Sequence, residues 1–321
     1  MDNKEKNVLA EDFQTIAQSD LPWEAFKGRS FVVTGATGLI GSLLVRALLY
    51  CDQVHGLGIK VYALVRNVEK AEKIFGETNA PEYLVADLAT DEIGGDFACD
   101  YVIHAAAVTT SKLMVSDPVG TIRTAIDGTE KLLKLAVEKK AQAFVYISSM
   151  EVYGQPKTDG KTAEKDLGYI DISTVRSCYP EGKRMCECLC NAYAAQYGLN
   201  VKSARLAQTF GAGILPTENR VFAQFARSAV NGENIVLHTT GESEGNYVYT
   251  ADAIRAILLL LVKGESGEAY NIANEQSHTT IRNMAELVAE QIAGGAISVV
   301  LDFPRDASSL GFAPPVKMWL D

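Results

Sequence analysis

The chain has 321 residues, of which 47% are hydrophobic and 22% are charged, and these proportions are typical of a folded globular protein rather than a disordered or collagen-like one. The formal net charge of −10 disfavours nucleic acid and anionic membranes as partners, because both attract basic proteins. Six cysteines without regular spacing do not indicate a disulfide framework.

The N-terminal 27 residues are acidic and mixed, and they contain no apolar stretch followed by a cleavage site. We expect them to form a helical extension that docks on the body. The most apolar run, AIRAILLLLV at 253–262, is about half the ~20 residues that a membrane span needs, and Arg255 interrupts it. It therefore predicts a buried helix. Together with cysteines that look reduced, these features predict a cytoplasmic protein with no membrane partner.

Strand and helix patterns alternate from residue 28 onward. Amphipathic helices such as GTEKLLKLAVEKK (128–140) separate the apolar strands. This alternation predicts an α/β protein with a Rossmann-type doubly wound parallel sheet, helices on both faces and ligands at the carboxyl ends of the strands. The predicted strands are RSFVVT (29–34), VYALVR (61–66), EYLVADL (82–88), DYVIHAAA (100–107), AFVYISS (143–149) and VKSARLAQTF (201–210).

The regular alternation stops after Phe210. We assign residues 28–212 to a dinucleotide-binding domain, to which residues 247–274 return as a helix and a strand. Residues 213–246 and 275–321 are predicted to form a smaller, interleaved substrate-binding lobe. This lobe should contain one helix near 221–230 and another near 281–292.

The segment GATGLIG (35–41) lies between the first strand and the first helix. Glycines in this context permit a tight turn and let backbone N–H groups approach a pyrophosphate, which favours a dinucleotide-binding loop over simple turn glycines. The alanines that follow the fourth strand offer small side chains where the dinucleotide would pass. The predicted cofactor-binding residues in these strand ends are Gly35, Thr37, Gly38, Leu39, Ile40, Gly41, Asp87, Leu88, Ala105, Ala106 and Ala107.

The end of the second strand bears on the choice between NAD and NADP. In NAD-binding proteins an acidic residue at this position usually bonds the ribose, but this chain has Val65, Arg66 and Asn67 there. Arg66 is either a partner for the extra phosphate of NADP or a solvated surface arginine, so we expect NAD or NADP with a slight preference for NADP. Asp87 either bonds the adenine amino group or caps a helix.

Three cysteines, Cys186, Cys188 and Cys190, lie two residues apart in a predicted helix. Because successive helical residues are rotated by about 100°, Cys186 and Cys190 share a face while Cys188 points away. Three thiolates in this arrangement cannot converge on one ion. We predict small buried side chains and no metal site.

Three motifs occur in order along the chain: the glycine loop, YISSMEVYG (146–154) and SCYPEGK (177–183). With them, residues 29 to about 300 resemble the extended short-chain dehydrogenase/reductase family. The resemblance implies a catalytic trio of Ser149, Tyr179 and Lys183, with Tyr179 and Lys183 also contacting the cofactor.

The physical chemistry of the trio agrees with this resemblance. A cationic lysine one helical turn from a phenol stabilises the phenolate and lowers the pKa of the tyrosine, so Tyr179 can exchange a substrate proton. Ser149 would bond the same substrate oxygen and orient the carbon for hydride transfer. An ordinary exposed pair of Tyr179 and Lys183 is the alternative.

Within this family, RSCYPEGKR (176–184) and EVYG (151–154) look most like UDP-glucuronate decarboxylases and the neighbouring nucleotide-sugar dehydratases and epimerases. The resemblance implies a nucleotide sugar that is oxidised at C4 and often receives the hydride back from the same cofactor. Glu151 is then either a general base beside the ketosugar or a structural residue under the loop.

Several positions depart from the pattern of the family. Met150 stands where the dehydratases carry an aspartate and the decarboxylases a serine, and Ala125 replaces an asparagine of the proton relay. Gly245 stands where an arginine commonly grips the substrate diphosphate, and Gln208 replaces an asparagine.

The predicted substrate-binding residues are Ser149, Gln208 and Arg220. Arg220 and Arg205 either supply positive charge to a phosphate or are solvated. The chain ends at KMWLD, where such relatives usually continue into one more short helix, so we expect a tail to be missing.

Three functions follow from these observations. The first is an NAD(P)-dependent oxidoreductase or lyase that acts on a nucleotide sugar as an epimerase, dehydratase or decarboxylase. The second is an NADPH-dependent reductase of a keto-sugar or a smaller carbonyl compound, and the third is a non-catalytic NADP-sensing protein. The resemblance also implies a homodimer formed through the helices at about 119–139 and 177–197.

Overall fold

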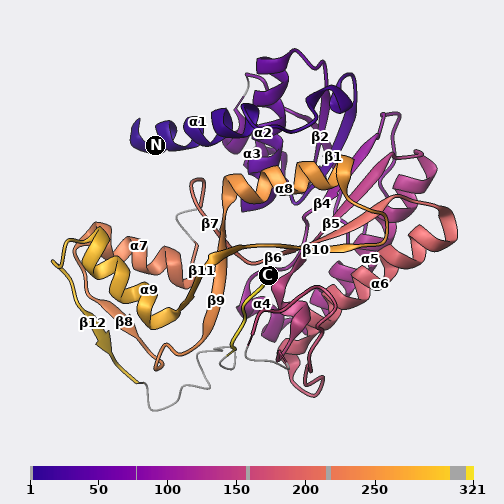
Figure 1. Cartoon of the computed structure of the whole chain (residues 1–321). Helices are drawn as coiled ribbons and strands as arrows, with labels where there is room; N and C mark the ends of the chain where they lie inside the picture. The colour runs from indigo at the N-terminus through magenta and orange to yellow at the C-terminus, as the bar shows by residue number, and fades with distance from the viewer. Residues whose placement is uncertain (1–2, 77, 157–159, 215–217, 304–315) are drawn as a thin grey trace.

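A parallel sheet forms the centre of the computed structural model, which describes residues 3–76, 78–156, 160–214, 218–303 and 316–321. Within these residues seven strands pair in the order β10-β6-β5-β4-β1-β2-β3, which confirms the Rossmann-type fold (Figure 1). The strands are β1 (Ser30–Thr34), β2 (Lys60–Val65), β3 (Glu82–Val85), β4 (Tyr101–His104), β5 (Ala143–Ser149), β6 (Val201–Leu206) and β10 (Ala269–Ile272).

Helices cover both faces of this sheet, as the strand–helix alternation predicts (Figure 1). One buried apolar cluster joins the sheet to α2 (Leu39–His55), α3 (Val68–Phe75) and α8 (Thr250–Lys263). A second cluster joins the opposite face to α5 (Pro118–Glu138) and α6 (Cys178–Tyr197), while the short α4 (Ser111–Ser116) precedes α5. Every residue of β1 is buried, as expected for a central parallel strand.

The apolar run at 253–262 lies within α8, whose inner face is buried against the sheet. This confirms the prediction of a buried helix. Among the described residues, no helix is both long enough and apolar enough to span a membrane.

The N-terminal segment forms α1 (Asn3–Ala17) and the short helix η1 (Trp23–Phe26), and the predicted docking on the body is confirmed. Leu9 and Ile16 of α1 are buried in the same cluster as α2 and α8. A ring stack between Trp23 and His55, with centroids 5.0 Å apart, fixes the end of the segment against α2.

The predicted sixth strand, 201–210, is two strands in different sheets. β6 ends at Leu206, and β7 (Gln208–Phe210) pairs with β9 (Glu244–Tyr249), which in turn pairs with β11 (Asn274–Thr280). The break at Ala207 is where the backbone N–H bonds the carbonyl oxygen of Ile272 and the chain leaves the central sheet.

A small lobe with its own apolar core lies beyond this break (Figure 1). It contains α7 (Val221–Asn231), α9 (Ile281–Leu287), a π-helical turn η4 (Val288–Ile292), and the parallel pair β8 (Ile235–Leu237) and β12 (Val299–Leu301). The two predicted helices of the lobe are confirmed. The exact domain limits stay a prediction, and the parts of the predicted lobe at 215–217 and 304–315 lie outside the described residues.

The C-terminal segment 316–321 lies between the small lobe and the central domain. Its backbone bonds Glu244 of β9, where Met318 donates to the carbonyl oxygen over 3.1 Å, while Thr162 donates to the carbonyl oxygen of Trp319 over 2.6 Å. Met318 and Leu320 are buried. The segment thereby extends the sheet of β9.

The three neighbouring cysteines of α6 adopt the predicted arrangement, with Cys186 and Cys190 buried and Cys188 exposed. In the part of the chain that the structure describes, no cluster of three potential metal ligands occurs.

Candidate active site

The glycine loop brings two of the predicted cofactor-binding segments into contact. Gly35 has φ +62°, and a Cβ there would lie 2.8 Å from the backbone of Ala105 and Ala106. A Cβ on Gly41 would lie 2.3 Å from the carbonyl oxygen of Gly35. These glycines therefore let the turn, α2 and the end of β4 approach one another without side chains between them.

The N-terminus of α2 faces this turn. Gly38 is the N-cap residue, it is exposed, and its N–H bonds the carbonyl oxygen of Gly35 over 2.9 Å. The first helical residues, Leu39 and Ile40, are partly buried, as is Thr37. An exposed backbone loop at the positive end of a 17-residue helix suits a pyrophosphate, so the residues present fit a dinucleotide.

His104 is buried and supports the end of β4, which lies against the glycine loop. The sequence analysis gave this residue no role. Nδ1 of His104 accepts the proton of the Thr34 hydroxyl over 2.7 Å, and the N–H of Ala106 donates to the Thr34 oxygen over 3.2 Å. Thr129 donates to the carbonyl oxygen of Ala125 over 2.6 Å, so it accepts from Nε2 of His104 over 3.1 Å. Burial lowers the pKa of His104 to about 3, which keeps the ring neutral.

The ends of β2 and β3 bring Arg66 and Asp87 together, with Nη1 3.7 Å from Oδ2. The other carboxylate oxygen of Asp87 accepts the N–H of Ala89 over 2.9 Å, as in a capped turn. Arg66 is largely exposed, whereas Leu88 is buried.

The trio of Ser149, Tyr179 and Lys183 converges at the carboxyl end of β5. The Ser149 hydroxyl accepts the N–H of Glu151 over 3.2 Å, and it acts to lower the pKa of Tyr179. Lys183 is buried, and its Nζ donates to the carbonyl oxygen of Ile147 over 2.7 Å and lies 5.9 Å from the centre of the Tyr179 ring. A hydroxyl pair beside a buried ammonium group is suited to proton exchange.

The prediction that Lys183 lowers the pKa of Tyr179 is wrong for this structure. Burial, followed by the charge of Glu151, raises the pKa of Tyr179 to about 12, against the opposing effects of Ser149, Arg176 and Arg220. The ammonium group instead faces the Ile147 carbonyl and lies 4.7 Å from the centre of the Tyr146 ring. Burial also lowers the pKa of Lys183 to about 8.

Glu151 is half-buried and forms a two-point ion pair with Arg176, with Nη1–Oε2 2.6 Å and Nη2–Oε1 3.0 Å. Arg176 stands three residues before Tyr179 in the RSCYPEGKR segment, and the sequence analysis gave it no role. Its Nε is buried and has no hydrogen-bond partner among the described residues. The pair with Arg176 favours the structural alternative for Glu151.

The small lobe contributes Arg220, the N-cap residue of α7. Its Nη2 lies 2.6 Å from the Glu218 carboxylate and its Nη1 3.4 Å from the carbonyl oxygen of Thr209. The charge of Arg220 acts to lower the pKa of Tyr179.

Gln208 and Gly245 lie in paired strands of the second sheet. Gln208 opens β7 opposite Tyr247 of β9, and Gly245 lies in β9, where a Cβ would be 3.9 Å from the carbonyl oxygen of Met318.

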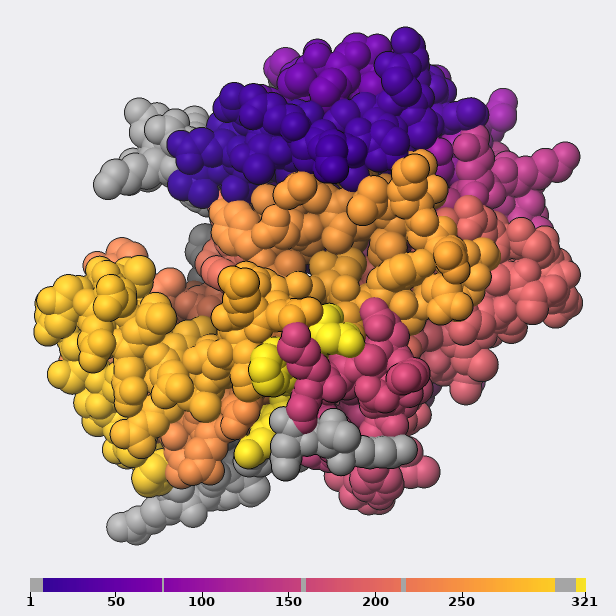
Figure 2. All heavy atoms as spheres, viewed as in Figure 1, coloured from indigo at the N-terminus to yellow at the C-terminus, as the bar shows by residue number. Residues whose placement is uncertain are grey.

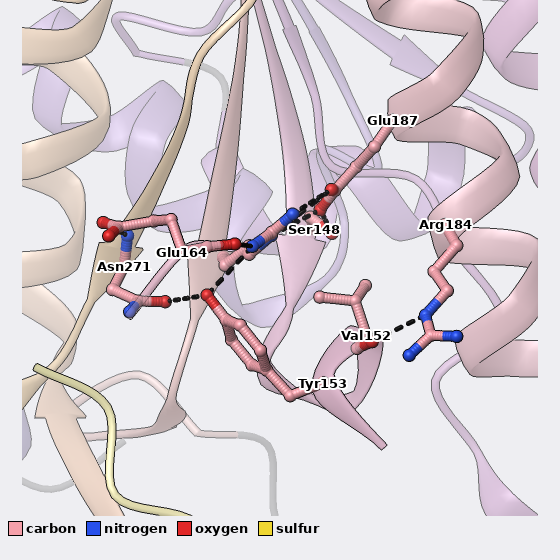
Figure 3. Close-up of polar contacts among 8 residues, drawn as sticks. Ser148, Val152, Tyr153, Glu164, Arg184, Glu187 and Asn271 are labelled. Atoms are coloured by element: carbon pink, nitrogen blue, oxygen red, sulfur yellow. Dashed lines mark hydrogen bonds and ion pairs between the residues drawn. The ribbon is translucent and has the colours of Figure 1, made fainter. Parts of the chain in front are cut away.

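Arg205 has neither of the two predicted roles. It is buried rather than solvated, and its Nη2 lies 2.6 Å from the Glu187 carboxylate instead of facing a substrate phosphate. Nη1 donates to the Tyr153 hydroxyl over 3.0 Å and to the carbonyl oxygen of Glu164 over 2.6 Å (Figure 3). A charged side chain on a buried strand must find a partner inside, and Glu187 of α6 supplies it.

The ion pair of Arg205 and Glu187 is the centre of a network of polar contacts (Figure 3). Ser148, next to Ser149, donates to Glu187 over 2.5 Å, and Tyr153 donates to Asn271 over 2.6 Å. Arg184 donates to the carbonyl oxygen of Val152 over 2.7 Å. The network fixes α6, which carries the Tyr and Lys, to the turn after β5, which carries the Ser.

Residues 31–273 match the family model described as "NAD dependent epimerase/dehydratase family". Among curated proteins, UDP-glucuronic acid decarboxylase 6 of Arabidopsis thaliana is 29% identical over 300 residues, with 89% of this chain and 84% of the relative covered. UDP-glucuronic acid decarboxylase 1 of Xenopus tropicalis is 27% identical over 279 residues, with 87% of this chain covered. The chain spans 64% of the length of that Xenopus protein.

Solved structures share the fold over most of the chain. A UDP-glucose 4-epimerase from Thermotoga maritima, bound to UDP-glucose, superposes with a TM-score of 0.75 at 25% identity. The superposition covers 91% of this chain and 89% of the epimerase chain. A UDP-glucose 4-epimerase from Thermus thermophilus, bound to NAD, gives a TM-score of 0.73 at 25% identity, with 91% and 90% covered. A dTDP-glucose 4,6-dehydratase from Streptomyces venezuelae, bound to NAD, is similar in fold, with a TM-score of 0.71 at 23% identity and 91% and 89% covered.

Proposed function

Because the chain belongs to the NAD-dependent epimerase/dehydratase family, we propose that it is an NAD-dependent enzyme that modifies a nucleotide-linked sugar through hydride transfer at a sugar carbon. The observation that carries this proposal is the convergence of Ser149, Tyr179 and Lys183 at the end of β5, in the sheet whose glycine loop fits a dinucleotide. The similarity to UDP-glucuronic acid decarboxylases and to UDP-glucose epimerases supports a nucleotide sugar as substrate.

The cofactor is held by the loop residues Gly35, Gly38 and Gly41 and by the alanines after β4. When bound, NAD accepts a hydride from the sugar and can return it. Arg66 shares its charge with Asp87, so it is not a dedicated partner for the extra phosphate of NADP. We therefore propose NAD rather than NADP, and two similar structures contain NAD.

Tyr179 exchanges the substrate proton. With a pKa of about 12 in the folded chain, its hydroxyl holds a proton at neutral pH and gives it to a substrate oxygen in the reducing direction. The oxidising direction requires the phenolate form, which the charges of Arg176 and Arg220 act to stabilise, and its oxygen then takes the proton of the substrate hydroxyl. Ser149, at the end of β5, orients the substrate oxygen.

Met150 limits the choice of reaction. It is partly buried against the apolar core, and its thioether carries no proton that could be given to a leaving hydroxyl group. This favours epimerisation, which needs only the proton of Tyr179, over dehydration.

We further propose a cytoplasmic homodimer. Helices α5 and α6 lie side by side on one face of the molecule (Figure 1) and leave Val119, Ile122 and Met185 exposed. A second copy of this helix pair would cover these side chains. Sedimentation at micromolar concentration tests the proposal, and a monomer there would contradict it.

The proposed function is tested first on the purified protein. Denaturation followed by mass spectrometry identifies any nucleotide that it releases, and incubation with UDP-glucuronate, UDP-glucose or dTDP-glucose tests turnover. We expect stoichiometric NAD and a product that has not changed its net oxidation state. If the protein is instead purified without a nucleotide, binds NADPH freely and oxidises it in the presence of a carbonyl compound, the reductase alternative would be established.

A further inference from the structure

Helix α1 lies outside residues 31–273, the part of the chain that matches the family model, yet it is in contact with two helices of the central domain. Figure 2 shows the N-terminal segment, in indigo, lying directly on the orange surface formed by residues near 250. Leu9 and Ile16 of α1 are buried against α2 and α8. The carbonyl oxygen of Ala17, at the end of α1, accepts Nε2–H of His55 over 2.8 Å.

One side chain of α1 reaches the junction of the two lobes. The Asp12 carboxylate accepts the hydroxyl proton of Tyr249 over 2.9 Å. Tyr249 is the last residue of β9, in the sheet of β7, β9 and β11, and the N-cap residue of α8, in the central domain. Burial and the Asp12 charge raise the pKa of Tyr249 to about 12, so the tyrosine remains the donor.

Tyr249 in turn holds the segment that follows β7. The ring centroids of Phe210 and Tyr249 lie 5.8 Å apart. A Cβ on Gly211, whose φ is +148°, would lie 2.8 Å from the Tyr249 ring. A Cβ on Gly213 would lie 3.0 Å from Leu43 of α2 and 3.5 Å from Leu9 of α1. Residues 209–213 are therefore fixed between Tyr249 and these two helices.

The same segment supports the arginine of the candidate site. The carbonyl oxygen of Thr209 lies 3.4 Å from Nη1 of Arg220, whose charge acts on Tyr179. Contacts therefore run without interruption from Asp12 through Tyr249 and residues 209–213 to Arg220.

We propose that Asp12 is a positioning residue, which acts through Tyr249 and residues 209–213 to hold the Arg220 guanidinium on the carbonyl oxygen of Thr209. The N-terminal helix thus contributes to the substrate site indirectly, through Tyr249 and residues 209–213. The role of Arg220 towards the substrate rests on the proposed function, whereas the fixing of residues 209–213 by Asp12 does not.

Hydrogen–deuterium exchange tests the contact with residues 209–213 without a substrate. We expect Asp12→Ala and Tyr249→Phe to accelerate exchange of the amides in 209–213 by roughly tenfold, the effect of losing about one hydrogen bond to a charged acceptor. Asp12→Asn keeps an acceptor for Tyr249 and should restore slow exchange. Glu11→Ala, on the exposed neighbouring residue, is the matched control. Equal exchange in Asp12→Ala, Tyr249→Phe and Glu11→Ala would overturn the proposal.

A double-mutant cycle tests the link to Arg220. With UDP-glucuronate as the probe, we expect Asp12→Ala and Arg220→Ala each to raise Kd about tenfold, and the double variant to bind no more weakly than Arg220→Ala alone. Independent, additive losses would overturn the positioning role. If the unaltered protein binds no UDP-glucuronate, this result counts against the proposed substrate, and the exchange experiment still decides whether Asp12 fixes residues 209–213.

Discussion

Glu187 of α6 and Arg205 of β6 form an ion pair whose closest atoms are 2.6 Å apart and which is almost closed to solvent. Removing one partner of a buried pair leaves the other charged and unpaired. We therefore expect Glu187→Ala to lower the free energy of unfolding by about 3–5 kcal/mol, measured by urea denaturation.

Two variants control this experiment. Glu181→Ala removes a more exposed carboxylate that lies 3.1 Å from Arg184, and it should cost less than about 1 kcal/mol. The double variant Glu187→Leu/Arg205→Met removes both charges and should regain most of the lost stability. An equal loss for Glu181→Ala and Glu187→Ala would show that burial of the pair does not matter.

Tyr179→Phe removes the hydroxyl that we assign to proton exchange. Turnover of the nucleotide sugar should fall by about 10²–10⁴-fold, because general acid–base catalysis contributes about that much. NAD released on denaturation should remain stoichiometric, since the glycine loop is untouched. Tyr169→Phe changes an exposed tyrosine and should leave both quantities unchanged; a Tyr179→Phe enzyme with full activity would rule out the proposed mechanism.

His104 makes the protein sensitive to acid. Its pKa is about 3 when folded and about 6.5 when unfolded, so the unfolded chain binds the extra proton between these values. Its contribution to stability is complete above pH 6.5 and is lost at about 1.4 kcal/mol per pH unit as the pH falls towards 3. Denaturant titrations from pH 7 to pH 4 should therefore show a shallower decline for His104→Gln than for the unaltered protein. His238→Gln, at an exposed histidine, should keep the original slope.

Gly41→Ala should impair NAD binding, because its Cβ would lie 2.3 Å from the carbonyl oxygen of Gly35 and the loop must shift. We expect the Kd for NAD, measured by titration calorimetry, to rise at least about tenfold, a cost of about 1.4 kcal/mol. Gly94→Ala adds the same methyl group where no atom lies within 4 Å. If both variants bind NAD equally well, the loop is not the cofactor cradle.

Arg66→Ala separates the two cofactors. A dedicated phosphate ligand would make the Kd for NADP rise much more than the Kd for NAD. Since Arg66 is largely exposed and lies 3.7 Å from Asp87, we expect both values to change less than about threefold, a few tenths of a kcal/mol. A selective loss of NADP affinity would restore the preference that the sequence suggested.

Local patterns were sufficient to predict the sheet, the glycine loop and the pairing of Tyr179 with Lys183 one helical turn away. The grouping of Ser149 with this pair was expected from the family resemblance. The environment of these groups was not predictable in the same way. The pKa of Tyr179 depends on how deeply the fold buries it, and the sequence alone contains no measure of that burial.

Contacts between distant segments account for the other errors. Arg205 looked like a free cation because its partner Glu187 comes from another element, and both are buried. The pairs Thr34–His104 and Glu151–Arg176 likewise join separate elements. A strand pattern such as VKSARLAQTF also gives no sign that its last residues leave for a second sheet, because the residues on both sides of Ala207 form strands.

The position of β10 affects how the protein is made. This strand pairs with β6 at the edge of the central sheet, but β7, α7, β8, β9 and α8 all come between them in the sequence. During synthesis the edge of β6 therefore stays unpaired until the ribosome has completed α7, β8, β9 and α8. Chains released before residue 269 would expose that edge, and we expect such fragments to aggregate or to be degraded rather than to accumulate as a separate dinucleotide-binding domain.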